Sequence, residues 1–293
     1  MATSKRRVTR DISYASSAQT RPGRAFIRVM ENATGRLRLI RRAEGYEHEV
    51  AGGRDFWKVM ADRYGLTLEL LRGSLDDVPK AGPLVVIANH PYGILDGLML
   101  GRILSETRGD FRIMAHQVFR KADELSRVIL PISFDETKDA QRLNLTTRRT
   151  ALKYLADGGA IGIFPGGTVS TAPKPFGRPM DPRWRTFTAK MILKSEATVL
   201  PIYFDGSNSR LFQVASHMHY TLRMALLIKE FKSRIDAPVR LSIGEPIVRQ
   251  NLECFAGDAL GLMDHLRRAT YALAPGAQRD AMLGHEFEGR YRA

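Results

Sequence analysis

Short apolar runs alternate with longer amphipathic stretches from residue 66 onwards. The runs are rich in Val, Ile and Leu, and several lead directly into turns that contain Gly or Pro, as buried strands do. Strands that alternate with helices predict an α/β domain, whose mixed, largely parallel sheet is flanked by helices. We predict strands at residues 66–71, 84–88, 111–114, 128–132, 160–164, 199–204 and 239–243, and helices at 95–105, 144–156, 184–195, 210–216, 222–231, 260–273 and 277–288.

The region before this domain has a different pattern. Residues 1–24 are polar and basic, which predicts a flexible tail. Within residues 25–80, apolar residues recur at helical spacing up to about residue 48 and again at 56–64, which predicts an N-terminal helical hairpin. Many Arg side chains accompany them, so the hairpin either packs on the core or forms a membrane-contact region. The α/β domain then covers residues 81–293.

Charge and composition narrow the class of protein. The 293 residues are 44% hydrophobic and carry a net charge of +14, which excludes general disorder and favours a polyanionic partner. The partner can be nucleic acid, an anionic membrane surface or a phosphorylated substrate. No stretch reaches the roughly 20 continuous apolar residues of a membrane span, and no secretory signal is visible at the start. The one cysteine, Cys254, excludes a disulfide scaffold. We therefore expect a peripheral protein on the cytoplasmic face of the plasma membrane.

The sharpest motif follows the predicted strand at 84–88. It reads Asn-His-Pro-Tyr-Gly-Ile-Leu-Asp-Gly from residue 89 to 97. Open α/β sheets bind ligands at the carboxyl ends of their strands. There, the imidazole of His90 can act as a general base, and the carboxylate of Asp96 can orient it through Nδ1. Pro91 and Gly93 permit the tight turn that brings the two together. The pattern favours catalysis over a structural His beside a helix-starting Asp.

This segment resembles the first motif of the phospholipid/glycerol acyltransferases, the lysophosphatidate acyltransferase superfamily. In that motif an Asp follows Asn-His after four residues. Here five residues intervene, as in the hemolysin-like branch that includes the acyltransferase half of ornithine-lipid synthases. The resemblance implies a glycerolipid acyltransferase-like fold, with His90 and Asp96 as catalytic residues and Asn89, Tyr92 and Gly93 as substrate-binding residues.

Two further blocks extend the resemblance over residues 84–247. A second apolar strand leads into a Gly-rich turn at residues 164–170, which resembles the family motif Phe-Pro-Glu-Gly-Thr-x-Ser but has Gly166 in place of Glu. Its free amides can form an anion-binding nest, and the resemblance implies that it binds the acceptor head group. The strand at 199–204 resembles the final motif, in which Pro201 lines the acyl-donor region. The implied binding residues of the second block are Phe164, Pro165, Gly166, Gly167, Thr168 and Ser170.

One family motif is incomplete. The family places a phosphate-binding Arg after the strand that corresponds to residues 128–132, and none stands there. This weakens the expectation of a phosphate-bearing acceptor. Other arginines near this strand can contact a head group or simply be solvated, and they are Arg120, Arg142, Arg148 and Arg149.

These features predict an O-acyltransferase. Gly-x-Ser-x-Gly is absent, so we expect direct transfer from an acyl thioester, either acyl-carrier protein or acyl-coenzyme A, to a lyso-lipid hydroxyl. The acceptor is a lysophospholipid, lysophosphatidate or lyso-ornithine lipid. We expect no other cofactor, no metal site and no nucleic acid partner, and His217 and His219 lack further ligands at a suitable spacing. A non-catalytic lipid-binding relative and a basic nucleic-acid-binding protein remain as alternatives.

Overall fold

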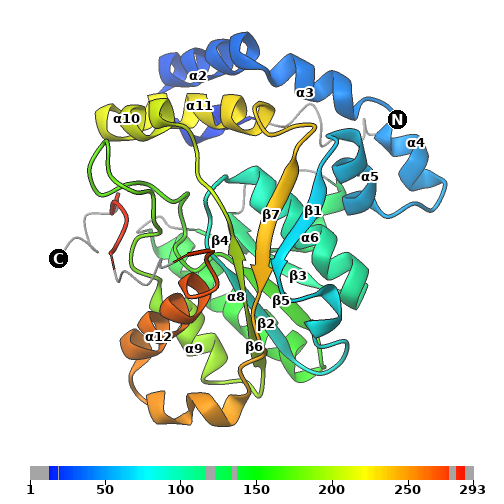
Figure 1. The fold of residues 1–293 in the computed structure, drawn as a ribbon, viewed down its shortest axis with the longest axis vertical. Helices are drawn as coiled ribbons and strands as arrows, with labels where there is room; N and C mark the ends of the chain where they lie inside the picture. The colour runs from blue at the N-terminus through cyan, green and yellow to red at the C-terminus, as the bar shows by residue number, and fades with distance from the viewer. Residues whose placement is uncertain (1–12, 19, 117–122, 134–136, 277–281, 288–293) are drawn as a thin grey trace.

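A seven-stranded sheet forms the centre of the molecule in the computed structural model, which describes residues 13–18, 20–116, 123–133, 137–276 and 282–287 (Figure 1). The strand order is β1-β7-β6-β2-β5-β3-β4, and every neighbouring pair is parallel except β6 and β7. The predicted mixed, largely parallel sheet is confirmed, with each predicted strand present. The strands are β1 (Thr67–Arg72), β2 (Leu84–Ala88), β3 (Arg112–His116), β4 (Ile129–Ile132), β5 (Ala160–Ile163), β6 (Thr198–Phe204) and β7 (Pro238–Ile243).

Helices cover both faces of the sheet. Alternate residues of a strand point to opposite faces, so a strand that is apolar throughout needs helices on both sides to bury it. In β2 every residue is buried. Leu84 and Val86 join a hydrophobic cluster with α5 and α6, whereas Val85 and Ile87 join a second cluster with α8, α9 and α12. These helices are α5 (Phe56–Arg63), α6 (Ile94–Arg108), α8 (Lys138–Ala156), α9 (Thr186–Ile192) and α12 (Ala259–Tyr271).

A further helical layer lies across the top of the sheet in Figure 1, where α2 packs against α11. The first arm of the predicted hairpin is three helices rather than one. The chain breaks at Gly35 and Gly45, whose φ values of 147° and 85° suit glycine. The elements of this region are α2 (Arg21–Thr34), α3 (Arg36–Ala43), α4 (Tyr46–Ala51), α10 (Arg210–Met218) and α11 (Tyr220–Lys232).

The predicted tail is shorter than residues 1–24. Residues 13–18 are held on α2 and include the short helix η1 (Ala15–Ser17). Glu31 of α2 is buried and accepts hydrogen bonds from Ser13 Oγ and the Tyr14 amide, each at 2.6 Å. Burial raises the pKa of the Glu31 carboxyl. The prediction is therefore wrong for residues 13–18 and 20–24, and residues 1–12 and 19 lie outside the described part of the chain.

The C-terminal region also differs from the prediction of a helix at 277–288. Residues 282–287 are not helical, and residues 277–281 and 288 lie outside the described ones. The Gly284 amide donates to Asp181 O at 2.8 Å. A Cβ on Gly284 would lie 1.8 Å from Met180 O, so this close backbone contact requires glycine. Besides η1, three short helices were not predicted: η2 (Leu75–Asp77), α7 (Asp123–Ser126) and η4 (Arg249–Phe255).

Among the described residues, no helix is both long enough and apolar enough to span a membrane.

Gly101 sets the contact between α5 and α6, and this yields a stability prediction. Trp57 is buried, and a Cβ on Gly101 would lie 2.2 Å from its ring. Gly101→Ala should therefore lower the free energy of unfolding by about 1–3 kcal/mol, as overpacking does. Gly97→Ala is the matched control on the same helix, because nothing lies within 4 Å of its Cβ position. It should be neutral or stabilising by up to about 1 kcal/mol. Denaturant unfolding of both variants checks this, and equal effects would contradict it.

Candidate functional site

His90 and Asp96 meet where β2 ends and α6 begins. His90 Nδ1 lies 3.0 Å from Asp96 Oδ2, which is within hydrogen-bond reach although the approach is bent. The Asp96 side chain is fully buried, whereas 19% of the His90 side chain is exposed. The structure thus brings together the two residues predicted to be catalytic. One end of the imidazole faces a buried carboxylate, and the ring remains open to solvent.

The turn between them holds the carboxylate in place. Asp96 Oδ2 accepts hydrogen bonds from the amides of Tyr92 at 2.8 Å and Gly93 at 3.0 Å. Gly93 has a φ of 93°, which favours glycine, and this conformation aims both amides at Asp96. Burial raises the pKa of the Asp96 carboxyl, and contact with His90 and the two amides opposes this. Oδ1 of Asp96 is buried and has no hydrogen-bond partner among the described residues.

The His90 ring is supported on its face by the second motif. Phe164 stacks on it with ring centroids 4.2 Å apart and planes at 26°. Phe164 follows β5, the neighbour of β2 in the sheet, so the two motifs meet at one edge. A carboxylate-oriented imidazole in this setting can take a proton from a bound hydroxyl and return it to a leaving group.

The Gly-rich turn after β5 has backbone amides available for an anion. Gly167 has a φ of 70°, and its amide donates to Phe164 O at 3.0 Å, so this amide is already used. The Pro165 carbonyl accepts from the Arg185 amide at 2.9 Å. Within the described residues, neither the amide of Gly166 nor that of Thr168 has a hydrogen-bond acceptor. These two amides are the candidates for the predicted nest.

Three residues predicted to bind substrate have hydrogen-bond or packing partners within the protein. The Asn89 amide group both donates to Phe204 O at 2.9 Å and accepts from Phe204 N at 2.7 Å, which joins β2 to β6. Tyr92 donates to Asp205 O at 2.7 Å, and burial raises its pKa to about 12. Pro201 is buried in β6 beside Ile87, inside the sheet. We assign these side chains to holding the site's frame.

Two buried residues near the motifs had no sequence prediction. Asp181 is fully buried and accepts from Ser170 Oγ at 2.5 Å. Arg223 of α11 is buried behind the Gly-rich turn and donates to Thr168 Oγ1 at 3.1 Å and Val169 O at 2.8 Å. Burial lowers the pKa of Arg223 to about 9. The sequence does contain a signal for Arg223, because it is the single charged residue within the apolar run of residues 222–228.

The arginines considered from the sequence for the head group lie elsewhere. Arg142 is exposed on α8 beside Asp139, at 3.8 Å, and Arg149 is exposed as well. The Arg148 guanidinium stacks over Phe187 at 4.8 Å. Arg120 lies outside the described residues. Arg223, by contrast, contacts the Gly-rich turn through its guanidinium group.

No metal site is visible in the described part of the chain, where no group of three or more His, Cys, Asp or Glu side chains is placed to hold an ion. His217 Nε2 lies 2.9 Å from Ala172 O, and His219 Nδ1 accepts from the Thr221 amide at 3.0 Å. Both histidines thus have local structural partners. The one cysteine, Cys254, is exposed.

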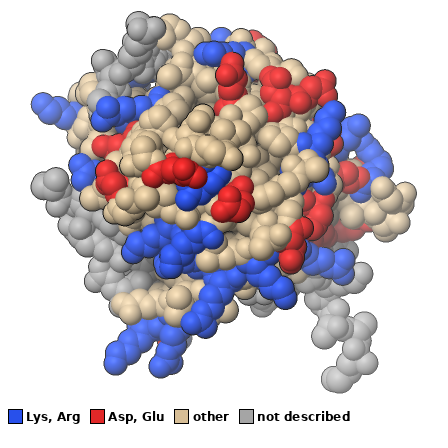
Figure 2. Space-filling view, turned by 90° about the horizontal axis from the view of Figure 1, so that it is seen from below, with Lys and Arg blue, Asp and Glu red and all other residues tan. Residues whose placement is uncertain are grey.

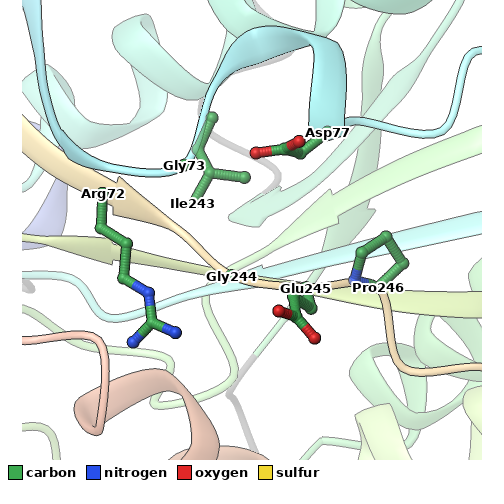
Figure 3. A pocket seen from close by; sticks show the side chains of 7 residues that line it. All are labelled: Arg72, Gly73, Asp77, Ile243, Gly244, Glu245 and Pro246. Carbon is green, nitrogen blue, oxygen red and sulfur yellow. The ribbon is translucent and has the colours of Figure 1, made fainter.

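A separate pocket of about 360 Å³ lies between the ends of β1 and β7 (Figure 3). Arg72 contributes one charged wall, and Asp77 and Glu245 contribute acidic groups. Because β7 is antiparallel to β6, and β6 is parallel to β2, this pocket follows the carboxyl ends of strands that run opposite to β2. It is therefore not part of the His90 site.

Residues 42–279 match the model of a family described as "Acyltransferase". The lyso-glycine lipid O-acyltransferase of Phocaeicola vulgatus is 26% identical over 187 residues, which are 61% of this chain and 64% of that protein. The protein of the same name from Bacteroides thetaiotaomicron is 24% identical over 187 residues, which are 61% of this chain and 66% of that protein. The chain thus spans just under two thirds of the length of these curated relatives.

One solved structure is also similar. The 1-acyl-sn-glycerophosphate acyltransferase of Thermotoga maritima superposes with a TM-score of 0.46 at 15% sequence identity, covering 85% of this chain and 95% of that chain.

Proposed function

Because the chain belongs to the acyltransferase family that its residues 42–279 match, we propose that it moves a fatty acyl group from a thioester to the hydroxyl of a lyso-lipid. The observation that carries this proposal is the partly exposed imidazole of His90, whose Nδ1 lies 3.0 Å from Oδ2 of the buried Asp96 carboxylate. Acyl transfer to a hydroxyl needs a base of this kind, because a neutral alcohol is a weak nucleophile.

The proposed reaction is direct. His90 takes the proton of the acceptor hydroxyl at Nε2 while Asp96 stabilises the imidazolium through Nδ1. The acceptor oxygen attacks the thioester carbonyl, and a tetrahedral oxyanion forms. When it collapses, the carbon–sulfur bond breaks and His90 returns the proton to the thiolate. The products are the diacylated lipid and a free thiol, and no acyl-enzyme is required.

The amides of Gly166 and Thr168 are the proposed donors to the oxyanion or to the acceptor head group. They lie in the turn that begins at Phe164, which stacks on His90. Preorganised backbone donors of this kind stabilise developing charge without reorganisation. Arg223 supports the turn from behind, since it donates to Thr168 and Val169.

For the acceptor, the relatives favour a lyso-lipid whose head group is an amino acid. Two of them are named lyso-glycine lipid O-acyltransferase. We place lyso-glycine and lyso-ornithine lipids first, ahead of lysophosphatidate and lysophospholipids. The donor is an acyl-carrier protein or acyl-coenzyme A. Figure 2 shows basic side chains gathered along one side of the face opposite the α2 layer. The net charge of +14 on the whole chain suits either acidic donor.

The α2 layer is the proposed contact with the cytoplasmic face of the membrane. Phe26 and Val29 of α2 and Leu37 of α3 are 42%, 65% and 54% exposed. Exposed arginines accompany them on these two helices, and they are Arg21, Arg24, Arg38 and Arg41. Apolar side chains with surrounding positive charge suit an anionic lipid surface.

This gives a binding prediction. Phe26→Ser combined with Val29→Ser should weaken binding to phosphatidylglycerol vesicles by at least about 10-fold, since each apolar side chain contributes roughly 1.5–3 kcal/mol when buried. Leu145→Ser is the control, because Leu145 is 47% exposed on α8, away from this layer. Co-sedimentation with vesicles measures the change. Equal binding by the double variant and the wild type would contradict membrane contact through α2.

The function itself is tested with purified protein, acyl-carrier protein or acyl-coenzyme A, and the four lyso-lipid classes. Mass spectrometry should detect one diacylated product together with free thiol. Vesicle binding without consumption of any donor would support a non-catalytic lipid-binding protein instead. Retention on nucleic acid with steep salt dependence, and none on vesicles, would support the nucleic-acid alternative.

A further inference from the structure

The main chain of His90 is fixed by a small closed ring of hydrogen bonds. The His90 amide donates to Asp181 Oδ1 at 3.2 Å, and the His90 carbonyl accepts from the Ser170 amide at 2.8 Å. Ser170 Oγ closes the ring by donating to the same Asp181 oxygen at 2.5 Å. Both polar groups of the His90 backbone are therefore held, one by Ser170 at the end of the Gly-rich turn and the other by Asp181.

Asp181 is itself held rigidly. Its Oδ2 accepts from the Trp184 indole at 2.9 Å, and its amide donates to the Tyr271 hydroxyl at 2.8 Å. Its carbonyl accepts from Arg267 Nη2 at 3.1 Å and from the Gly284 amide at 2.8 Å. The residue thus links the site to α12 and to the C-terminal segment 282–287. Among the described residues, the donors to its carboxylate are all neutral groups. They stabilise the carboxylate, because a buried charge needs several hydrogen bonds.

Gly166 makes room for this carboxylate. A Cβ at position 166 would lie 3.3 Å from Asp181 Cγ and from Oδ2, which is tighter than ordinary van der Waals contact. A larger residue at this position would press its Cβ against the buried carboxylate, so the glycine that stands in place of the expected Glu fits beside Asp181.

We propose that Asp181, together with Ser170, is a positioning residue that holds the His90 backbone so that the imidazole faces both Asp96 and the acceptor hydroxyl. The proposal rests on the proposed function for its kinetic consequence. Small displacements of a general base are costly, since a misplacement of about 1 Å can lower the rate on the order of 100-fold. The role is an indirect one, because Asp181 acts on the substrate only through His90.

Ser170→Ala is the primary test, since it opens the ring and keeps the charge of Asp181. We expect kcat to fall about 10- to 100-fold while KM for donor and acceptor changes less than about threefold. Asp181→Asn should lower kcat at least as much. The control is Thr147→Val, which removes a buried hydroxyl that donates to Pro131 O at 2.6 Å outside the site. It should leave kcat unchanged.

The second readout does not require turnover. NMR of histidine-labelled protein reports the ring signals of the seven histidines, and His90→Gln identifies the His90 signals. In Ser170→Ala the chemical shifts of the His90 ring should change, because the imidazole moves relative to the Phe164 ring that stacks on it. Unchanged His90 ring shifts together with an unchanged kcat would overturn the proposal. Changed His90 ring shifts in a protein that acylates no lyso-lipid would support positioning and reject the proposed function. If Asp181→Asn does not fold, Ser170→Ala decides alone.

Discussion

His90→Ala should lower acyl transfer by on the order of 10²- to 10⁴-fold, because it removes the group proposed to take the acceptor proton. The fold should survive the change. His90 lies at the end of β2 with part of its side chain exposed, and its main packing partner is the Phe164 ring. We expect the free energy of unfolding to fall by about 1 kcal/mol, as is common for a partly buried side chain.

The measurement is initial-rate transfer from a labelled acyl thioester, with denaturant unfolding of the same preparation. His48→Ala is the matched control, because His48 is exposed on α4 and away from the site. It should retain full activity. Comparable turnover by a folded His90→Ala protein would remove the general-base mechanism, and a loss of folding in both variants would mean that the assay reports stability alone.

The sheet was predictable because its strands carry their signal locally. In β2 each of five residues is buried, so its sequence is a continuous apolar run, and turns bound it on both sides. The N-terminal region was harder to predict. Gly35 and Gly45 interrupt an apolar pattern that continues in phase across them, so one helix was expected where three occur. The docking of residues 13–18 depends on Glu31, a polar residue whose burial has no local signature.

The candidate site also has residues that the local sequence predicts and residues that it does not. His90 and Asp96 are close in sequence, and the turn between them contains the glycine that their geometry needs, so residue types and spacing were enough. Asp181 reaches His90 across 91 positions of the chain, and Arg223 reaches Thr168 across 55. Contacts of this kind are set by how β2, β5 and α11 pack, and no periodicity or short motif contains that information. Asn89 and Tyr92 lie within the motif, but the partners of their side chains are backbone groups of residues 204 and 205, which the motif does not contain.

Asp96→Asn should separate activity from stability at the same site. The amide keeps the shape of the side chain and can still accept from the Tyr92 and Gly93 amides, but it carries no charge to stabilise an imidazolium. Transfer should fall on the order of 10²- to 10⁴-fold. The free energy of unfolding at pH 7 should be unchanged or higher, because the wild-type protein must keep a buried carboxylate ionised with one oxygen unpartnered among the described residues.

The raised pKa of Asp96 determines how its contribution to the free energy of unfolding changes with pH. Burial raises the pKa of Asp96 in the folded protein above its ordinary value, so over the window between the two values the folded state binds more protons than the unfolded state. The contribution of Asp96 to stability is therefore largest below this window and falls as the pH rises through it. Urea unfolding of wild type and Asp96→Asn from pH 4 to pH 8 should show the variant gaining stability relative to wild type as the pH increases. Asp258→Asn, which keeps the N-cap of α12, should show no loss of transfer. If the variant instead loses stability relative to wild type as the pH rises, the ionised Asp96 carboxylate stabilises the fold. That result would contradict the prediction that burying this charge costs folding free energy.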